Sequence, residues 1–249
     1  MSESPLILSV ETATLAGSVC LSRGTMVLGF KFGNPQHSHS NSLLADINEQ
    51  LKEAGVTLED VDLFAAAAGP GSFTGLRIGL ATTKALAATL ERPCVGIPTL
   101  QAIAHAAGPS SGTVALLPAG RGEVFVQLLS VSTEAVVSEL DAPAHLSPRN
   151  MLAKYDHKRD LKWCGEGAEI HKELIRHYAQ ERAIQFREES LLSSPVGIEA
   201  GWKLIGRQSN LAKSVAALAL NKLRHGELDS PSSLRAIYVR PSDAELKEQ

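Results

Sequence analysis

A run of small residues that ends in a glycine–proline–glycine turn constrains this chain more than any other feature. Residues 65–79 read AAAAGPGSFTGLRIG. Four alanines suit a strand that is buried on both faces, and Ser72 can cap a following helix that runs to about Leu90. Such a turn between strand and helix is a common phosphate site, whereas small residues on a helix allow a second helix to approach closely.

The standard phosphate-binding patterns do not fit this turn. A Walker loop needs Gly-x-x-x-x-Gly-Lys-Ser/Thr, but the sixth position is Thr74 counted from Gly69 and Leu76 counted from Gly71, without a lysine after either. The dinucleotide pattern needs a third glycine where Thr74 stands. A simple anion site at the helix start stays open. Ser72 lacks the Gly-x-Ser-x-Gly elbow of a nucleophile, and a capping role accounts for it.

The helix that follows the turn is apolar or small on nearly every side. Gly75 and Gly79 are four residues apart and therefore share a face. Arg77 and Lys84 are the only charges before Glu91. Because a helix without a polar face is usually buried on two sides, we expect a second helix to pack on this one.

The rest of the chain alternates strands and helices in two similar halves. Expected strands lie at 6–10, 17–22, 27–32, 62–67 and 94–97, with helices at about 40–54, 72–90 and 99–107. This order predicts an α/β fold, with mixed sheets and flanking helices. Beyond a linker at 108–112, strands at 114–117 and 124–129 repeat the opening pattern, followed by helices near 147–155 and 211–225 and a last strand at 237–239. We therefore predict two lobes, 1–108 and 109–249, and the helix at about 211–225 belongs to the second or packs back on the first.

Composition excludes several functional classes. The net charge of −3 and a pI near 6.2 argue against a stand-alone nucleic-acid binder. Cys20, Cys94 and Cys164 are expected to be buried, reduced thiols. No apolar run reaches about 18 residues and no leader is recognised, so we expect a cytoplasmic protein that does not enter a membrane. His37 and His39 lack a third ligand nearby, which is a weak pattern for a metal.

Two further turns carry charged residues. Glu11 and Thr12 follow the first strand, and Arg121 and Glu123 lie in the turn between the strands at 114–117 and 124–129. In a two-lobed nucleotide-binding fold such turns can face each other across a cleft, where carboxylates hold Mg²⁺ and Arg121 contacts phosphate. We therefore treat these four residues as a candidate nucleotide cleft.

Five motifs, in this order, resemble the TsaB (YeaZ) family: Ser9-Val10-Glu11-Thr12-Ala13, the run from Ala68 to Gly79, Gly96-Ile97-Pro98-Thr99-Leu100, Arg121-Gly122-Glu123-Val124-Phe125 and Tyr238-Val239-Arg240-Pro241. The resemblance implies an actin-like or sugar-kinase-like fold of two RNase H-like lobes. It also implies a role in making N6-threonylcarbamoyladenosine in tRNAs that read codons beginning with A. The implied partners are the catalytic transferase TsaD and the ATPase TsaE, with tRNA reached through the complex.

The resemblance further implies that this chain is not itself an enzyme. The catalytic relative holds a metal with His-x-x-x-His, whereas Thr99 and Ile103 stand at those positions and cannot ligate a transition metal. Glu11 replaces the family's usual aspartate, and Pro118 replaces another. We expect no metal and no tightly bound cofactor, with ATP and Mg²⁺ weakly bound or absent and the cleft vestigial.

The resulting hypothesis is a non-catalytic subunit that activates TsaD by heterodimerising through two helices. We expect the interface at Leu43, Leu44, Ile47, Leu51, Ser72, Gly75, Leu76, Gly79, Leu80 and Thr83, with a homodimer possible when the chain is alone. Replacing Gly79 with leucine is expected to abolish pairing and leave the fold intact. The alternatives are an ATP-dependent phosphotransferase or a metallopeptidase-like enzyme of the same superfamily, and a module that binds tRNA directly.

Overall fold

The computed structural model describes residues 4–33, 39–189, 200–206 and 210–239. Its contacts divide the chain into two compact units, which are considered separately below. Unit 1 comprises Met1–Ala102 and Ser209–Ile237, and unit 2 comprises Ile103–Gln208 and Tyr238–Gln249. The division falls between Ala102 and Ile103, inside a helix, rather than at the expected 108/109, and it assigns the helix at 211–225 to unit 1.

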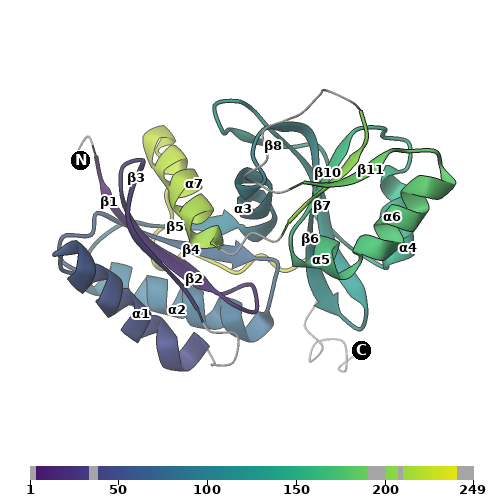
Figure 1. Ribbon diagram of the computed structural model, residues 1–249. Helices are drawn as coiled ribbons and strands as arrows, with labels where there is room; N and C mark the ends of the chain where they lie inside the picture. Colours follow the sequence, from purple (N-terminus) through teal and green to yellow (C-terminus); the bar gives the residue numbers. More distant parts are fainter. Residues whose placement is uncertain (1–3, 34–38, 190–199, 207–209, 240–249) are drawn as a thin grey trace. The chain divides into compact units, whose positions relative to one another are not determined.

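Unit 1 is a five-stranded mixed sheet with helices on both faces (Figure 1). The strand order is β3-β2-β1-β4-β5, in which β1–β3 are antiparallel and β4 and β5 run parallel to β1. The elements are β1 (Leu6–Glu11), β2 (Ser18–Arg23), β3 (Met26–Phe32), α1 (His39–Ala54), β4 (Leu63–Gly69), α2 (Phe73–Thr89), β5 (Cys94–Pro98), α3 (Thr99–Ala106, divided between the units) and α7 (Leu211–His225).

Alternating side chains of the central strands serve the two faces of this sheet. Leu6, Leu8 and Val10 of β1 pack with α1 and α2, whereas Ile7 packs with α7, as the two-residue period of a strand requires. Ser9 also points toward α7, and its hydroxyl donates to the carbonyl oxygen of Ala212 at 2.8 Å. Figure 1 shows α1 and α2 on one face and α7 on the other. The central strands are therefore buried on both sides.

Unit 2 is a seven-stranded sheet with a core rich in aromatic side chains. The order is β11-β12-β10-β6-β7-β8, and β9 also pairs with β7. Trp163 and Trp202 lie 4.8 Å apart between ring centroids, and Tyr155 donates a hydrogen bond to Asp141. The elements are β6 (Ser110–Gly120), β7 (Glu123–Val131), β8 (Val137–Glu139), β9 (Ala144–Leu146), α4 (Pro148–Tyr155), β10 (Leu161–Cys164), α5 (Glu166–Ile170), α6 (Lys172–Glu181), β11 (Phe186–Glu189) and β12 (Trp202–Ile205).

The structure confirms the predicted α/β class and the order of elements in the first half. Two local expectations are wrong. Strand β6 begins at Ser110, inside the stretch expected to be a linker. Residues 237–239 do not form a strand; the amide of Ile237 donates to the carbonyl oxygen of Ala68 at 2.7 Å, and no ladder follows. None of the helices in the described part of the chain is long and apolar enough to cross a membrane.

Candidate functional site

The turn after β1 fits against the glycine face of α2. The Thr12 hydroxyl donates to the carbonyl oxygen of Gly75 at 2.7 Å, and the amide of Ser72 donates to the carbonyl oxygen of Ala13 at 2.8 Å. A Cβ added at Gly75 would overlap the Thr12 carbonyl oxygen, and one added at Gly79 would overlap the Thr12 hydroxyl oxygen. The space that these glycines create is thus filled by Thr12 of the same chain.

This packing corrects the residues expected at a partner interface. Eight of the ten lie in the interior of unit 1, namely Leu43, Ile47, Leu51, Gly75, Leu76, Gly79, Leu80 and Thr83. Leu44, which is 59% exposed, and Ser72 reach the surface. The expectation that Gly79→Leu leaves the fold intact is also wrong, because a side chain there collides with Thr12. The glycine face of α2 packs against the turn after β1 of the same unit.

The backbone amides of the glycine-rich turn already donate hydrogen bonds to acceptors within the protein. Gly69 donates to the Thr99 hydroxyl at 3.1 Å, Ser72 donates to Ala13, and Gly75 donates to the Ser72 hydroxyl at 3.2 Å. Ser72 is therefore the N-cap of α2, as predicted. A phosphate cradle needs such amides to point at the ligand, so this turn is poorly suited to hold one.

The four residues of the candidate nucleotide cleft lie in different units. The Glu11 carboxylate is buried and accepts from the Thr14 amide and hydroxyl, both at 2.7 Å. In unit 2, Arg121 is exposed at the tip of the β6–β7 hairpin, with a φ of 52°. Whether the two turns face each other stays a prediction. The Glu11 carboxylate stabilises its own turn in this structure.

Glu123 has a partner that sequence reasoning missed. One of its carboxylate oxygens lies 2.8 Å from Nε2 of His145, whose ring is 5.6 Å from that of Phe125. Strand β9 sets Phe125 opposite His145. The sequence could have indicated this pair only through strand β9, which is too short to show a clear alternating pattern. Glu123 is thus held at the start of β7, directly after the hairpin turn.

The positions of the expected metal pair contribute to packing. Thr99 and Ile103 are both buried, and the Thr99 hydroxyl is the acceptor for Gly69 described above. Within the described ranges, no group of three or more His, Cys, Asp and Glu side chains could hold a metal ion. His37 and the side chain of His39 lie outside the described residues.

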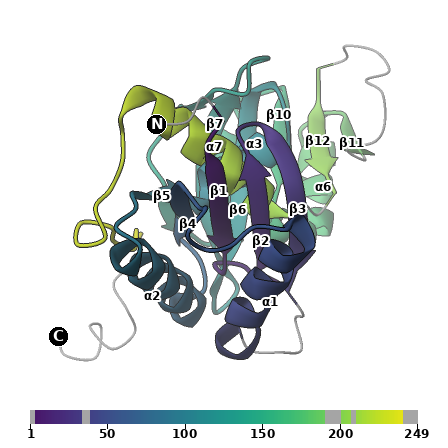
Figure 2. The same ribbon diagram turned by 90° about the vertical axis from the view of Figure 1, so that its left-hand side faces the viewer.

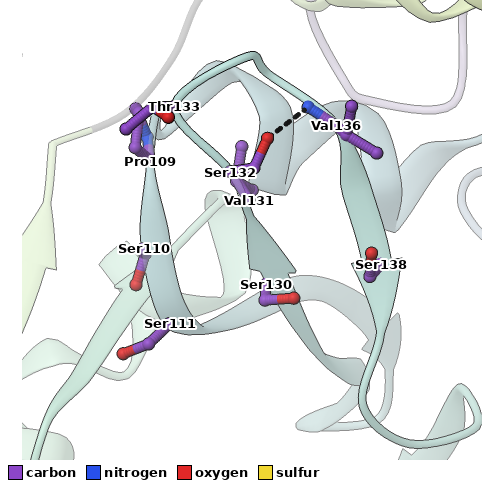
Figure 3. Close-up of a pocket in the computed structure, with 9 residues that line it drawn as sticks. All are labelled: Pro109, Ser110, Ser111, Ser130, Val131, Ser132, Thr133, Val136 and Ser138. Atoms are coloured by element: carbon purple, nitrogen blue, oxygen red, sulfur yellow. Dashed lines mark hydrogen bonds between the residues drawn. The ribbon is translucent and has the colours of Figure 1, made fainter.

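A pocket in unit 2 is lined by the ends of β6, β7 and β8 and by the turn between β7 and β8 (Figure 3). Its volume is about 530 Å³, and its lining is uncharged and without aromatic rings. The Ser132 hydroxyl accepts a hydrogen bond from the amide of Val136 at 3.3 Å across its rim. The lining residues are Pro109, Ser110, Ser111, Ser130, Val131, Ser132, Thr133, Val136 and Ser138. None of the predicted site residues contributes to it.

Helices α1 and α2 lie side by side and expose small and apolar residues (Figure 2). Leu44 on α1 and Ala81 and Ala85 on α2 are exposed. Near the start of α2, the guanidinium of Arg77 lies 3.8 Å from the ring centroid of the partly exposed Phe73. The spacing of four residues between an aromatic and a cationic side chain was the available signal for this pair. Charged side chains are also exposed on α1, at Glu49, Lys52 and Glu53, so the uncharged part of this face is limited to residues such as Leu44, Ala81 and Ala85.

Comparisons with known proteins identify the family. The family model of TsaD, tRNA N6-adenosine threonylcarbamoyltransferase, matches residues 34–239. The chain is 32% identical to the tRNA threonylcarbamoyladenosine biosynthesis protein TsaB of Buchnera aphidicola subsp. Schizaphis graminum over 208 residues, which is 84% of each chain. The chain belongs to the TsaB (YeaZ) family.

Other members of the TsaB family resemble the chain over shorter or more distant alignments. The TsaB protein of Escherichia coli K12 is 36% identical over 123 residues, so the aligned part spans 48% of this chain and 52% of that relative. The structure of YeaZ from Pseudomonas aeruginosa superimposes with a TM-score of 0.72 at 23% identity, covering 94% of this chain and 99% of that one. This likeness confirms the actin-like fold of the TsaB family.

Proposed function

We propose that this protein is a non-catalytic subunit of the system that makes N6-threonylcarbamoyladenosine in tRNA, and that it activates a TsaD-like transferase by forming a heterodimer. Family membership carries the proposal: the curated TsaB relatives from Buchnera and E. coli are named for this biosynthesis. The match to the TsaD family model supports a partner of related fold.

The residues at the expected metal positions support the non-catalytic role. Thr99 and Ile103 lie inside the region that matches the TsaD family model, and both are buried in the packing of the chain. The methyl and methylene groups of these side chains cannot ligate a metal. The Thr99 hydroxyl already accepts a hydrogen bond from the amide of Gly69. A chain with these two side chains does not offer the imidazole pair that the resemblance associates with transfer.

The exposed face of α1 and α2 is the proposed partner surface, with residues corrected from the sequence analysis. Leu44, Ala81 and Ala85 are exposed there, and the Phe73–Arg77 pair lies at one end. The aromatic–arginine pair is of the residue types enriched at protein interfaces, and the small side chains beside it allow a partner to approach closely. The buried glycines of α2 contribute indirectly, because they fix the helix against Thr12.

The test is the modification itself. A strain that lacks this chain should lose N6-threonylcarbamoyladenosine from its tRNA, measured by mass spectrometry of digested nucleosides, and the wild-type chain should restore it. The purified chain should co-elute with the TsaD-like subunit of the same cell and raise its transfer rate, and a TsaE-like ATPase should join the pair. Unchanged nucleoside levels in the deletion strain would contradict the proposal.

The enzymatic alternatives make separate demands on the purified chain. A phosphotransferase must bind Mg-ATP tightly, which isothermal titration calorimetry measures, and a metallopeptidase must carry a metal, which elemental analysis measures. We expect weak or undetectable ATP binding and no stoichiometric metal. A direct tRNA-binding module would show binding that weakens steeply with salt, and the net charge of −3 argues against it.

A further inference from the structure

The segment that follows α7 covers the outer edge of β5. Gly226 caps the end of α7, and residues 227–237, here called the strap, continue within unit 1. The amide of Asp229 donates to the carbonyl oxygen of Cys94 at 2.8 Å, the Cys94 amide donates back at 3.3 Å, and the Asp229 carboxylate accepts the amide of Gly96 at 2.9 Å. Figure 2 shows the strap in yellow between α7 and β5. In the described residues this edge is thus closed by an isolated bridge rather than by a paired strand.

Leu234 anchors the middle of the strap in the core. It is 2% exposed and belongs to the apolar cluster on the α2 side of the sheet, together with Cys94 and Ala68. A Cβ added at Gly96 would lie 2.9 Å from Cδ1 of Leu234. The missing side chain at Gly96 therefore makes room for this leucine.

The strap ends against the glycine-rich turn that precedes α2. The amide of Ile237 donates to the carbonyl oxygen of Ala68 at 2.7 Å. A Cβ added at Gly69 would overlap the carbonyl oxygen of Ile237, and Gly69 has a φ of 118°, which favours glycine. Ser72, three residues further on, is the N-cap of α2. The position of Ile237 is therefore coupled to the turn from which α2 begins.

Few contacts hold the strap between these anchors. The side chains of Ser230, Ser233 and Arg235 are exposed, and the amide of Ser233 donates back to the carbonyl oxygen of Ser230 within the strap. Among the described residues, the hydrogen bonds from the strap to the sheet involve Asp229 and Ile237. Strand β1, in contrast, pairs with β2 and β4 on its two sides. Segments with few buried contacts open at a lower free energy than central strands.

We propose that the strap is a latch that opens reversibly while the five-stranded sheet stays folded, and that in its closed position it fixes the glycine-rich turn at the start of α2. Opening exposes the β5 edge at Cys94 and Gly96 and withdraws Leu234 from the core. Closure restores an acceptor for the Gly96 amide. Because Phe73 and Arg77 lie in the first two turns of α2, the latch also governs how this pair is presented.

Cysteine labelling of the full chain reports the opening. The thiol of Cys94 donates to the carbonyl oxygen of Asp229 at 3.6 Å, whereas Cys20 packs with α7 on the other face of the sheet. Burial raises the pKa of both thiols to about 11, so Cys20 is a matched internal control. Iodoacetamide at pH 8 should modify Cys94 about tenfold or more faster than Cys20. Below the unfolding transition the Cys94 rate should rise slightly with urea and the Cys20 rate steeply, because the slope scales with the surface exposed.

Two variants test whether the labelling of Cys94 follows the strap. Leu234→Ala removes the apolar anchor and should speed the labelling at low urea about tenfold or more. Glu227→Ala is the matched control, because Glu227 lies in the strap with an exposed side chain. This change should leave the labelling rate within about twofold of wild type.

Hydrogen exchange tests the link to the glycine-rich turn. The amides of Gly69 and Ser72 should exchange faster in Leu234→Ala than in wild type, by about the same factor as the labelling of Cys94. Equal urea dependence of Cys94 and Cys20 labelling would overturn the latch, because the edge would then open only when unit 1 unfolds. A Cys94 rate that Leu234→Ala leaves unchanged, or unchanged exchange at Gly69 and Ser72, would overturn it as well.

Discussion

The hydroxyl of Thr12 occupies the space that a side chain at position 79 would need. A Cβ at Gly79 would overlap Thr12 Oγ1, while the same hydroxyl donates to the carbonyl oxygen of Gly75 at 2.7 Å. One side chain of the β1 turn therefore fixes both the position of α2 and the identity of its glycines. The β1 turn and the start of α2 behave as one packed element.

Gly79→Ala is expected to lower the free energy of unfolding by up to about 2 kcal/mol. Alanine is the better helix former by about 1 kcal/mol, but overpacking against Thr12 costs about 1–3 kcal/mol. Urea unfolding of the single variant, of Thr12→Ala and of the double variant measures the coupling. Because Thr12→Ala removes the overlapping oxygen, the double variant should be more stable than the sum of the single effects predicts. Additive effects would contradict this packing.

Leu44→Glu tests the proposed partner surface without disturbing the core. Leu44 is 59% exposed on α1, so a charge there should leave the free energy of unfolding, measured in urea, within about 0.5 kcal/mol of wild type. The same charge should weaken association with the TsaD-like subunit by about tenfold or more, because a carboxylate would be desolvated in an apolar contact. Leu174→Glu, at a residue 41% exposed on α6, is the matched control. Equal loss of association in both variants would refute this surface.

Glu11→Ala is expected to lower the free energy of unfolding by about 2–3 kcal/mol. The buried carboxylate accepts the amide and the hydroxyl of Thr14, and its removal leaves both donors without this acceptor. Glu11→Gln retains one acceptor and should lose less stability. Calorimetry with Mg-ATP should give the same weak or absent signal for wild type and Glu11→Gln. A tight site that Glu11→Gln abolishes would instead show that the carboxylate serves a nucleotide.

Local patterns predicted most of unit 1 because its strands and helices carry clear periodicity. The strand at 62–67 and the cap at Ser72 needed only neighbouring residues. The partner of the glycine face could not be predicted in this way, since Thr12 is distant in sequence and an apolar helix face does not reveal what covers it. Small residues on α2 were compatible with a partner helix or with the chain's own β1 turn.

Unit 2 was harder to predict for a different physical reason. Strands β9, β11 and β12 are short and pair across long sequence separations, so few residues of each show an alternating pattern. The aromatic pair Trp163 and Trp202 joins neighbouring strands β10 and β12, a contact that depends on the order of strands in the sheet. The His145–Glu123 pair depends on the same kind of long-range register.

The buried thiols predict how stability depends on pH. Burial raises the pKa of the Cys20 thiol to about 11, against the opposing effects of the Lys213 charge and the Ser9 hydroxyl. The unfolded thiol ionises near pH 9, so between about pH 9 and 11 the unfolded state binds fewer protons and the free energy of unfolding falls as pH rises. Cys20→Ala should remove about 2 kcal/mol of this fall, measured by urea unfolding at pH 8 and pH 10.5.

The same burial predicts that the thiols react slowly in the folded chain. Burial also raises the pKa of Cys94 to about 11 and that of Cys164 to about 12, so thiolate, the reactive form, is scarce at neutral pH. Iodoacetamide at pH 8 should modify all three cysteines in urea and none at a comparable rate in buffer, as mass spectrometry would show. Rapid alkylation of Cys20 in the folded chain, or equal pH slopes for wild type and Cys20→Ala, would show that this thiol is accessible to water.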